Sequence, residues 1–300
     1  MMLPQQRNQS LDGIRDRVLS NADAAIVHAY YGVESQQHPY YAQALAAGVN
    51  RWLESEYLDK EPRLFASATI APQDTQGAVA ELRRVAANKR FIQVLLPARA
   101  PEPYGSQRYW PIWEAAAEEG MAIAITYGGS TGTPQTPNGW MSSLFEEYTS
   151  FQQVFEAHVM SMVASGIFAK LPDLKLVVME SGWTWLPGLM WRMDTEWHTA
   201  RREVPWVELP PSEYVKRHVR FTTLPIDSSS SPKHLEELLE QLGSSELLMY
   251  GSDFPRTYEP SMENLLAVMD AEQRDRVLWS NAAETYKISL PSSASPAPAG

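Results

Sequence analysis

The sequence predicts an α/β protein of the (β/α)8 TIM-type barrel class in which the first strand is missing or irregular. Short apolar segments rich in Val, Ile, Leu and Ala alternate with longer helix-like segments along the chain. The apolar segments lack polar alternation, which is typical of parallel strands covered on both faces. Seven strand–helix units can be counted, whereas a closed barrel of this class has eight strands.

The strands are expected where apolar residues run without interruption, at residues 24–29, 64–70, 91–96, 121–127, 174–179, 219–224 and 247–250. Repeated strand–helix alternation implies parallel strands joined by right-handed crossovers. One short helix candidate, residues 11–19, precedes the first of these strands, and no convincing strand does. We therefore expect the barrel to be incomplete on its N-terminal side or to have something irregular there.

Helices are expected between the strands, and several show recognisable ends. The segments at 39–57 and 111–119 begin with Pro, which suits a first helical turn, and Gly120 suits the end of the second. The other candidates are residues 76–88, 146–170, 186–202, 232–242 and 261–269. We predict one domain over residues 1–290 and a disordered tail at 291–300, because that tail is rich in Pro, Ala and Ser.

Composition excludes several classes of function. The chain has 300 residues, 44% of them hydrophobic, and a formal net charge of −11, which disfavours nucleic acid as a partner. It has no Cys, so disulfides, thiolate metal sites and a Cys nucleophile are excluded. It contains no apolar run of about 18 residues that would span a membrane. With no classical signal peptide in view, a cytoplasmic protein is expected.

Functional residues are expected at the carboxyl ends of the predicted strands, where parallel α/β proteins carry their active sites. Asp253 follows one apolar strand and is soon followed by Pro255, which places it at this edge; a turn cap is the alternative. Glu180 directly follows another apolar strand, where an unpaired charge would be costly. It is expected to pair with Arg192 or Arg256, or to act in catalysis.

Other strand ends add a smaller set of candidates. Alone among six histidines, His28 lies near such an end, and we group it with Tyr127 as a catalytic candidate. A Gly-, Thr- and Pro-rich loop after Tyr127 favours a lid. No HxH or HExxH pair, Walker A or GxGxxG motif is present. The candidates for binding a small-molecule substrate, with an arginine on its carboxylate, are Thr126, Trp183, Arg99 and Arg256.

Six stretches, at residues 39–58, 91–125, 165–194, 202–223, 247–256 (LLMYGSDFPR) and 281–286 (NAAETY), carry a resemblance to a known family. They resemble the amidohydrolase-related branch of the metal-dependent hydrolase superfamily, which includes aminocarboxymuconate-semialdehyde-type decarboxylases. The resemblance covers about residues 24–290. It implies a (β/α)8 barrel and cleavage of C–C or C–N bonds, by nonoxidative decarboxylation or by hydrolysis at a metal-activated water.

The resemblance also implies where a metal would bind. The family's first strand carries an HxH pair, and this chain is expected to start after that strand. Thr126 stands where the fifth-strand His of the family falls, and Glu180 stands where many members have His. The eighth-strand Asp is kept as Asp253, whereas Arg256 replaces a His that often follows it. Because only Asp253 matches, no metal ligands are assigned and no cofactor is expected; a divalent metal such as zinc is left open as an alternative that the sequence does not support.

Three functions are consistent with these observations. The favoured one is a barrel enzyme acting on a small carboxylated or cyclic substrate by metal-independent acid–base chemistry. Asp253 would be the general acid or base, assisted by Glu180, Tyr127 and His28. The alternatives are a metal-dependent decarboxylase or hydrolase whose first strand is missing from this chain, and a noncatalytic binding or scaffold protein. The Trp-rich segment at 185–206 suggests in addition a homodimer contact.

Overall fold

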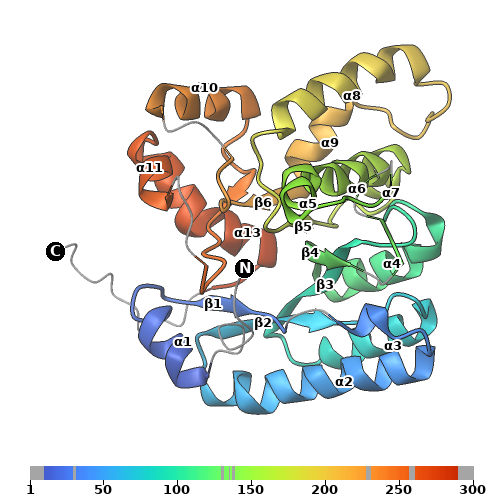
Figure 1. The fold of residues 1–300 in the computed structure, drawn as a ribbon, viewed down its shortest axis with the longest axis vertical. Coiled ribbons are helices and arrows are strands. Elements are labelled where there is room, and N and C mark those ends of the chain that lie inside the picture. Colours follow the sequence, from blue (N-terminus) through green and yellow to red (C-terminus); the bar gives the residue numbers. More distant parts are fainter. Residues whose placement is uncertain are drawn as a thin grey trace.

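A computed structural model describes residues 10–29, 32–129, 132–134, 136, 139–227, 231–256 and 261–289. Its seven strands form one sheet in sequential order, and each pairs in parallel with its neighbour (Figure 1). Within the described ranges, no pairing joins β7 to β1, so the sheet is an open barrel, which confirms the predicted irregular barrel. The strands are β1 (Ala25–Val27), β2 (Leu64–Thr69), β3 (Phe91–Arg99), β4 (Ala122–Gly129), β5 (Leu176–Val178), β6 (Val219–Thr222) and β7 (Leu248–Met249).

Helices connect the strands and pack around the sheet (Figure 1). The α-helices are α1 (Leu11–Arg17), α2 (Pro39–Glu56), α3 (Thr75–Val85), α4 (Trp110–Glu119), α5 (Leu144–Ser150), α6 (Gln152–Ala164), α7 (Ile167–Lys170), α8 (Leu186–Ala200), α9 (Pro211–His218), α10 (Pro232–Leu242), α11 (Met262–Ala267), α12 (Ala271–Asp275) and α13 (Asn281–Tyr286). Shorter helical turns are η2 (Val33–Ser35), η3 (Leu58–Lys60), η4 (Gln107–Tyr109) and the π-helical η5 (Arg276–Ser280).

One predicted helix is divided in the structure. The segment expected as a single helix at 146–170 forms α5, α6 and α7. Between α6 and α7, Gly166 has a left-handed backbone with φ 79°, a conformation that ends helices and favours glycine. A Cβ at this position would lie 2.2 Å from Cδ1 of Trp206, so the packing of Trp206 also requires glycine here. Amphipathic periodicity alone does not reveal such a break.

The core has two parts, one on each face of the sheet. The larger part lies between the strands and the surrounding helices and includes Trp113 and Phe155. The smaller part fills the inside of the open barrel, where Tyr286 of α13 joins residues such as Met179. The Tyr286 hydroxyl donates to Gln93 Oε1 at 2.6 Å. The C-terminal helix therefore supplies a side chain to the interior of a barrel that has seven described strands.

None of the described helices combines the length and the apolar character that crossing a membrane requires. The predicted tail at 291–300 lies outside the described residues.

Candidate active site

Glu180 and Asp253 both turn out of the sheet at its carboxyl edge. Glu180 follows β5 and Asp253 follows β7, and their backbones are left-handed, with φ of 60° and 46°. Residues other than glycine rarely adopt this conformation, and residues held in it are concentrated at functional sites. The two acids therefore leave their strands in the same way and at the same edge.

These two carboxylates share one guanidinium. Nη1 of Arg256 lies 3.2 Å from Oε2 of Glu180 and 3.1 Å from Oδ2 of Asp253. The carboxylate side chains are only 14% and 15% exposed, respectively, so the attraction is screened less than at the surface. We call Glu180, Asp253 and Arg256 the mouth triad. Of the two partners expected for Glu180, the structure selects Arg256, because Arg192 pairs with Glu196 on α8.

Two threonines hold Glu180 in this arrangement. Thr126, on β4, donates its hydroxyl to Oε1 of Glu180 at 3.0 Å. The backbone N–H of Glu180 donates to Oγ1 of Thr222 at 3.1 Å, which ties the turn after β5 to β6. The two neighbouring strands thus hold Glu180, one at its carboxylate and the other at its backbone. The structure brings the predicted residue Thr126 into direct contact with the triad.

Burial and like charge act together on the triad. Burial raises the pKa of Glu180 well above its usual range, and the nearby charge of Asp253 raises it further, against the opposing effects of Arg256 and Thr126. His28 follows β1 and is accessible to solvent. Desolvation by the surrounding protein lowers the pKa of His28, and the charge of Asp253 opposes that shift. A neutral imidazole therefore lies within electrostatic reach of Asp253.

Tyr127 lies on the other face of β4 from Thr126, because successive strand residues point to opposite faces. Its ring packs against Phe151, with ring centroids 4.3 Å apart, and its hydroxyl donates to Oε1 of Glu147 at 3.1 Å. Burial raises the pKa of Tyr127 further above its already high usual value. Within the described ranges the structure does not bring Tyr127 to the triad.

Trp183 is fully buried in the helix-side core and donates its indole N–H to the carbonyl oxygen of Thr223 at 3.1 Å. It has no accessible surface here, so its expected contact with substrate stays a prediction. Arg99 ends β3 and is half-buried, in register with Gly129 of β4. It thus stands at the same edge of the sheet as the triad.

Glu34 is a residue at this end of the fold that strand-end reasoning missed, because it lies in η2, in the connection between β1 and α2. The Gln73 amide anchors η2 by donating to the carbonyl oxygens of Val33 and Gln36, both at 3.0 Å. Burial raises the pKa of Glu34 to about 7, opposed in part by the charge of Arg99. The sequence signal that could have identified Glu34 is its position as an acidic residue in the loop between a strand and a helix.

The buried histidines are structural. His158 is sandwiched between β3 and Tyr104: it contacts the carbonyl oxygen of Ala98 and accepts from the Tyr104 N–H at 3.1 Å. Burial lowers the pKa of His158 to about 4. His218 contacts the carbonyl oxygen of Leu174 at 2.9 Å. Within the described part of the chain, no three His, Asp or Glu side chains gather closely enough to enclose a metal ion.

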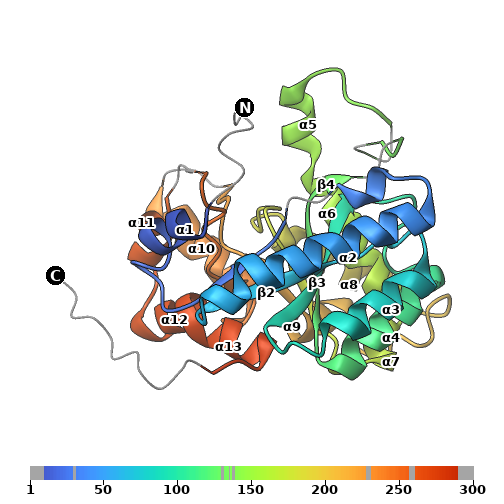
Figure 2. The ribbon, with the colours of Figure 1, turned by 90° about the horizontal axis from the view of Figure 1, so that it is seen from below.

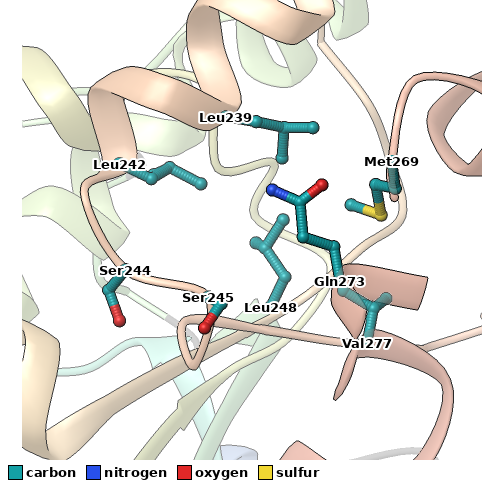
Figure 3. A pocket seen from close by; sticks show the side chains of 8 residues that line it. All are labelled: Leu239, Leu242, Ser244, Ser245, Leu248, Met269, Gln273 and Val277. Atoms are coloured by element: carbon teal, nitrogen blue, oxygen red, sulfur yellow. The ribbon is translucent and has the colours of Figure 1, made fainter. Parts of the chain in front are cut away.

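Two further features lie away from the triad. A cavity of about 130 Å³ lies beside the loop that enters β7, opposite the carboxyl edge (Figure 3). Its lining residues are Leu239, Leu242, Ser244, Ser245, Leu248, Met269, Gln273 and Val277.

Helix α5 projects from the body with none of its residues buried (Figure 2). Parts of the loop before it lie outside the described residues, so the expected lid stays a prediction.

Comparison with known proteins supports the resemblance. Gamma-resorcylate decarboxylase from Rhodococcus jostii is 24% identical over 233 residues, which are 70% of this chain and 66% of that protein, just under two thirds of its length. A dihydroxybenzoic acid decarboxylase from Polaromonas, solved with manganese and 2-nitroresorcinol, has a TM-score of 0.73 at 19% identity, covering 95% of this chain and 89% of its own. A manganese-bound 5-carboxyvanillate decarboxylase from Novosphingobium aromaticivorans has a TM-score of 0.75 at 20% identity, covering 94% and 82%.

These structures correct one expectation from the sequence. We expected no cofactor and a metal-independent reaction, because only Asp253 matched the ligand pattern. Two decarboxylases that share the fold hold manganese, so that expectation is wrong. The expectation rested on the absence of His at the family's ligand positions, whereas carboxylates also bind divalent ions such as Mn²⁺. A family model described as Amidohydrolase matches residues 11–288, and the chain therefore belongs to the amidohydrolase family.

Proposed function

We propose that this chain is a metal-dependent decarboxylase that removes the carboxylate from small hydroxylated aromatic acids. The observation that carries the proposal is the mouth triad, in which two strand-end carboxylates converge on a single cation. The substrate class is supported by the relatives, whose names are those of gamma-resorcylate, dihydroxybenzoic acid and 5-carboxyvanillate decarboxylases.

The donors at this edge suit a divalent ion. Carboxylate oxygens are ligands that Mn²⁺ prefers, and hard ions are commonly held by one or two carboxylates while water and substrate complete the shell. Glu180 and Asp253 already lie within 3.2 Å of a shared cationic nitrogen. His28 lies within electrostatic reach of Asp253, but among the described residues no third His, Asp or Glu side chain joins the two carboxylates closely enough to complete a metal site. We infer that Glu180 and Asp253 would hold the metal, and that water and substrate would supply the other ligands.

The reaction breaks the C–C bond between the ring and the carboxylate, releases CO2 and places a proton on the ring carbon. When bound, a divalent metal supplies a Lewis acid that withdraws charge from substrate oxygens. We assign delivery of the proton to Asp253, because a carboxylic acid at the carboxyl edge of the sheet can act as a general acid. Thr126 and Thr222 keep Glu180 fixed during this exchange. His28, which is accessible to solvent, can return a proton to Asp253.

The proposal is tested by assaying the protein with and without added Mn²⁺ on 2,6-dihydroxybenzoate and 5-carboxyvanillate. We expect the decarboxylated phenol by chromatography, with no product in the presence of a chelator. Elemental analysis of the same sample establishes whether metal is bound. Metal-loaded protein that leaves every acid of such a panel unchanged would refute the proposed reaction.

A further inference from the structure

We propose that Thr222 and Thr223, at the carboxyl end of β6, are positioning residues that fix the spacing of Glu180 and Asp253. The inference deepens the proposed function and rests on it in one respect, since it takes these two carboxylates as ligands of a divalent ion. It gives a part in the site to β6, a strand that contributes no member of the mouth triad.

The two carboxylates follow strands that are not neighbours. Glu180 follows β5 and Asp253 follows β7, and β6 lies between these strands in the sheet. Arg256 bridges the two carboxylates, but a metal ion would compete with it for the same oxygens. A fixed spacing therefore requires contacts that join each turn to β6 and leave the carboxylate oxygens unused.

The hydroxyl of Thr222 makes such a contact with the turn that carries Glu180. Its Oγ1 accepts from the backbone N–H of Glu180 at 3.1 Å and lies 3.5 Å from the carbonyl oxygen of Leu224, to which it donates. Glu180 has a left-handed backbone with φ 60°, a conformation that persists only where the surrounding structure imposes it. The Thr222 hydroxyl supplies part of that constraint without using the carboxylate.

The hydroxyl of Thr223 holds the turn that carries Asp253. Its Oγ1 accepts from the backbone N–H of Gly251, two residues before Asp253, at 3.3 Å. The backbone of Thr223 is itself fixed, because its N–H donates to the carbonyl oxygen of Met249 at 2.9 Å and its carbonyl oxygen accepts from the Trp183 indole at 3.1 Å. Thr223 is fully buried, so solvent does not compete for its hydroxyl.

Close packing at Gly251 links the two turns. A Cβ at this position would lie 2.7 Å from Cβ and 2.9 Å from Cγ2 of Thr222. These atoms belong to a short side chain whose hydroxyl already contacts Glu180, so they have little freedom to move away. The turn that carries Asp253 thus packs on the residue that holds Glu180. We call Thr222, Thr223 and Gly251 the β6 clamp.

A fixed spacing of two carboxylates bears on which divalent ion they hold. Ca²⁺ accepts a variable number of oxygen ligands in a flexible arrangement, whereas Mn²⁺ is held by oxygen ligands in octahedral geometry. An ion that requires defined geometry gains more from ligands that are already in place. Loosening the β6 clamp should therefore weaken the binding of Mn²⁺ more than the binding of Ca²⁺.

The test is calorimetric titration of the protein with Mn²⁺ and with Ca²⁺, in the absence of substrate. Thr222→Val keeps the shape of the side chain but loses the acceptor, so we expect the Kd of Mn²⁺ to rise about tenfold and the Kd of Ca²⁺ to rise less. Thr223→Val should act in the same direction, and Gly251→Ala should do so by displacing Thr222. Thr222→Ser retains the hydroxyl and should restore the affinity for Mn²⁺.

Thr69→Val is the matched control. Thr69 ends β2 at the same edge of the sheet, and its buried hydroxyl has no hydrogen-bond partner within the described part of the chain. The same substitution should therefore leave both Kd values unchanged. Thermal melting of each variant verifies folding and measures any loss of stability separately from the loss of affinity.

The outcomes separate the β6 clamp from the proposed reaction. If the clamp variants bind Mn²⁺ selectively more weakly than wild type but no acid is decarboxylated, the reaction fails and the clamp stands. If product forms and the folded variants all keep the wild-type Kd for Mn²⁺, the clamp is overturned and the reaction stands. An equal rise in Kd for both ions, a loss that Thr222→Ser does not restore, or folded wild type that does not bind Mn²⁺ also overturns the clamp.

Discussion

Two carboxylate–arginine clusters lie at opposite edges of the sheet and differ in their balance of charge. At the amino edge, Glu61 precedes β2 and is contacted by Nε of Arg15 and Nε of Arg63, both at 3.0 Å. One carboxylate has two guanidiniums, so these partners lower the pKa of Glu61 to about 2, although burial opposes them. Nη1 of Arg15 also lies 3.4 Å from Oδ1 of Asp12, so the cluster has two carboxylates and two guanidiniums and its charges balance.

At the carboxyl edge the balance differs, because two carboxylates of the mouth triad share one guanidinium. Within this triad carboxylates outnumber guanidiniums by two to one, and burial together with the second carboxylate raises the pKa of Glu180. A cluster with balanced charges suits a structural role, joining α1 to the segment that precedes β2. A cluster with surplus carboxylate still attracts a cation. The comparison teaches that charge balance and sheet edge, rather than the presence of an ion pair, distinguish a candidate site.

The largest effect is expected from Asp253→Asn. Removing this carboxylate takes away the proposed proton donor and one of the two proposed metal ligands, so kcat should fall about 100-fold or more. Steady-state kinetics in the presence of Mn²⁺ measure the loss of kcat, and calorimetric titration of Mn²⁺ measures the loss of metal affinity.

Glu61→Gln serves as the matched control for Asp253→Asn, since it alters the other cluster and should leave kcat and Mn²⁺ affinity unchanged in folded protein. Equal losses of activity in both variants would remove the distinction between the two edges.

A smaller effect is expected from Glu61→Gln, and it is an effect on stability rather than on activity. The variant loses charge-assisted hydrogen bonds to two partly exposed arginines, so the free energy of unfolding should fall by about 1–2 kcal/mol near neutral pH. Because the folded pKa is about 2, below the ordinary value of 4.5, this contribution is present above the ordinary value and is lost as pH falls toward 2. Urea titrations over this pH range measure it; a deficit that persists at the acid end contradicts the pKa assignment.

The smallest effect is expected from Glu34→Gln, a pH-dependent change in stability. Burial raises the pKa of Glu34 from 4.5 to about 7, so wild type loses stability as pH rises from the lower value through the upper one. The variant should therefore gain stability relative to wild type over this range and then keep a constant advantage. Thermal melting across the range checks this. If the variant instead gained stability relative to wild type as pH falls, the folded protein would stabilise Glu34 as a carboxylate, as it does Glu61, and the prediction would be wrong.

Much of the fold could be predicted because the signals are local. Every expected strand is present and differs mainly at its ends, since a buried parallel strand is an uninterrupted apolar run. The short helices α9, α12 and α13 were missed, because few residues carry too little periodicity. In the site, Thr126 was expected to bind substrate and Tyr127 to assist catalysis. They point to opposite faces of β4, and of the two only Thr126 contacts the triad.

By itself, the sequence determined the order of strands and the edge at which Glu180 and Asp253 emerge, because both follow from patterns within a few residues. The tertiary structure decided which arginine neutralises them and how closely the turns that carry them pack. Glu180 and Arg256 are 76 positions apart, and Gly251 packs against Thr222 because it has no side chain. Ion pairing and burial depend on distances between remote segments, and only the folded chain sets those distances.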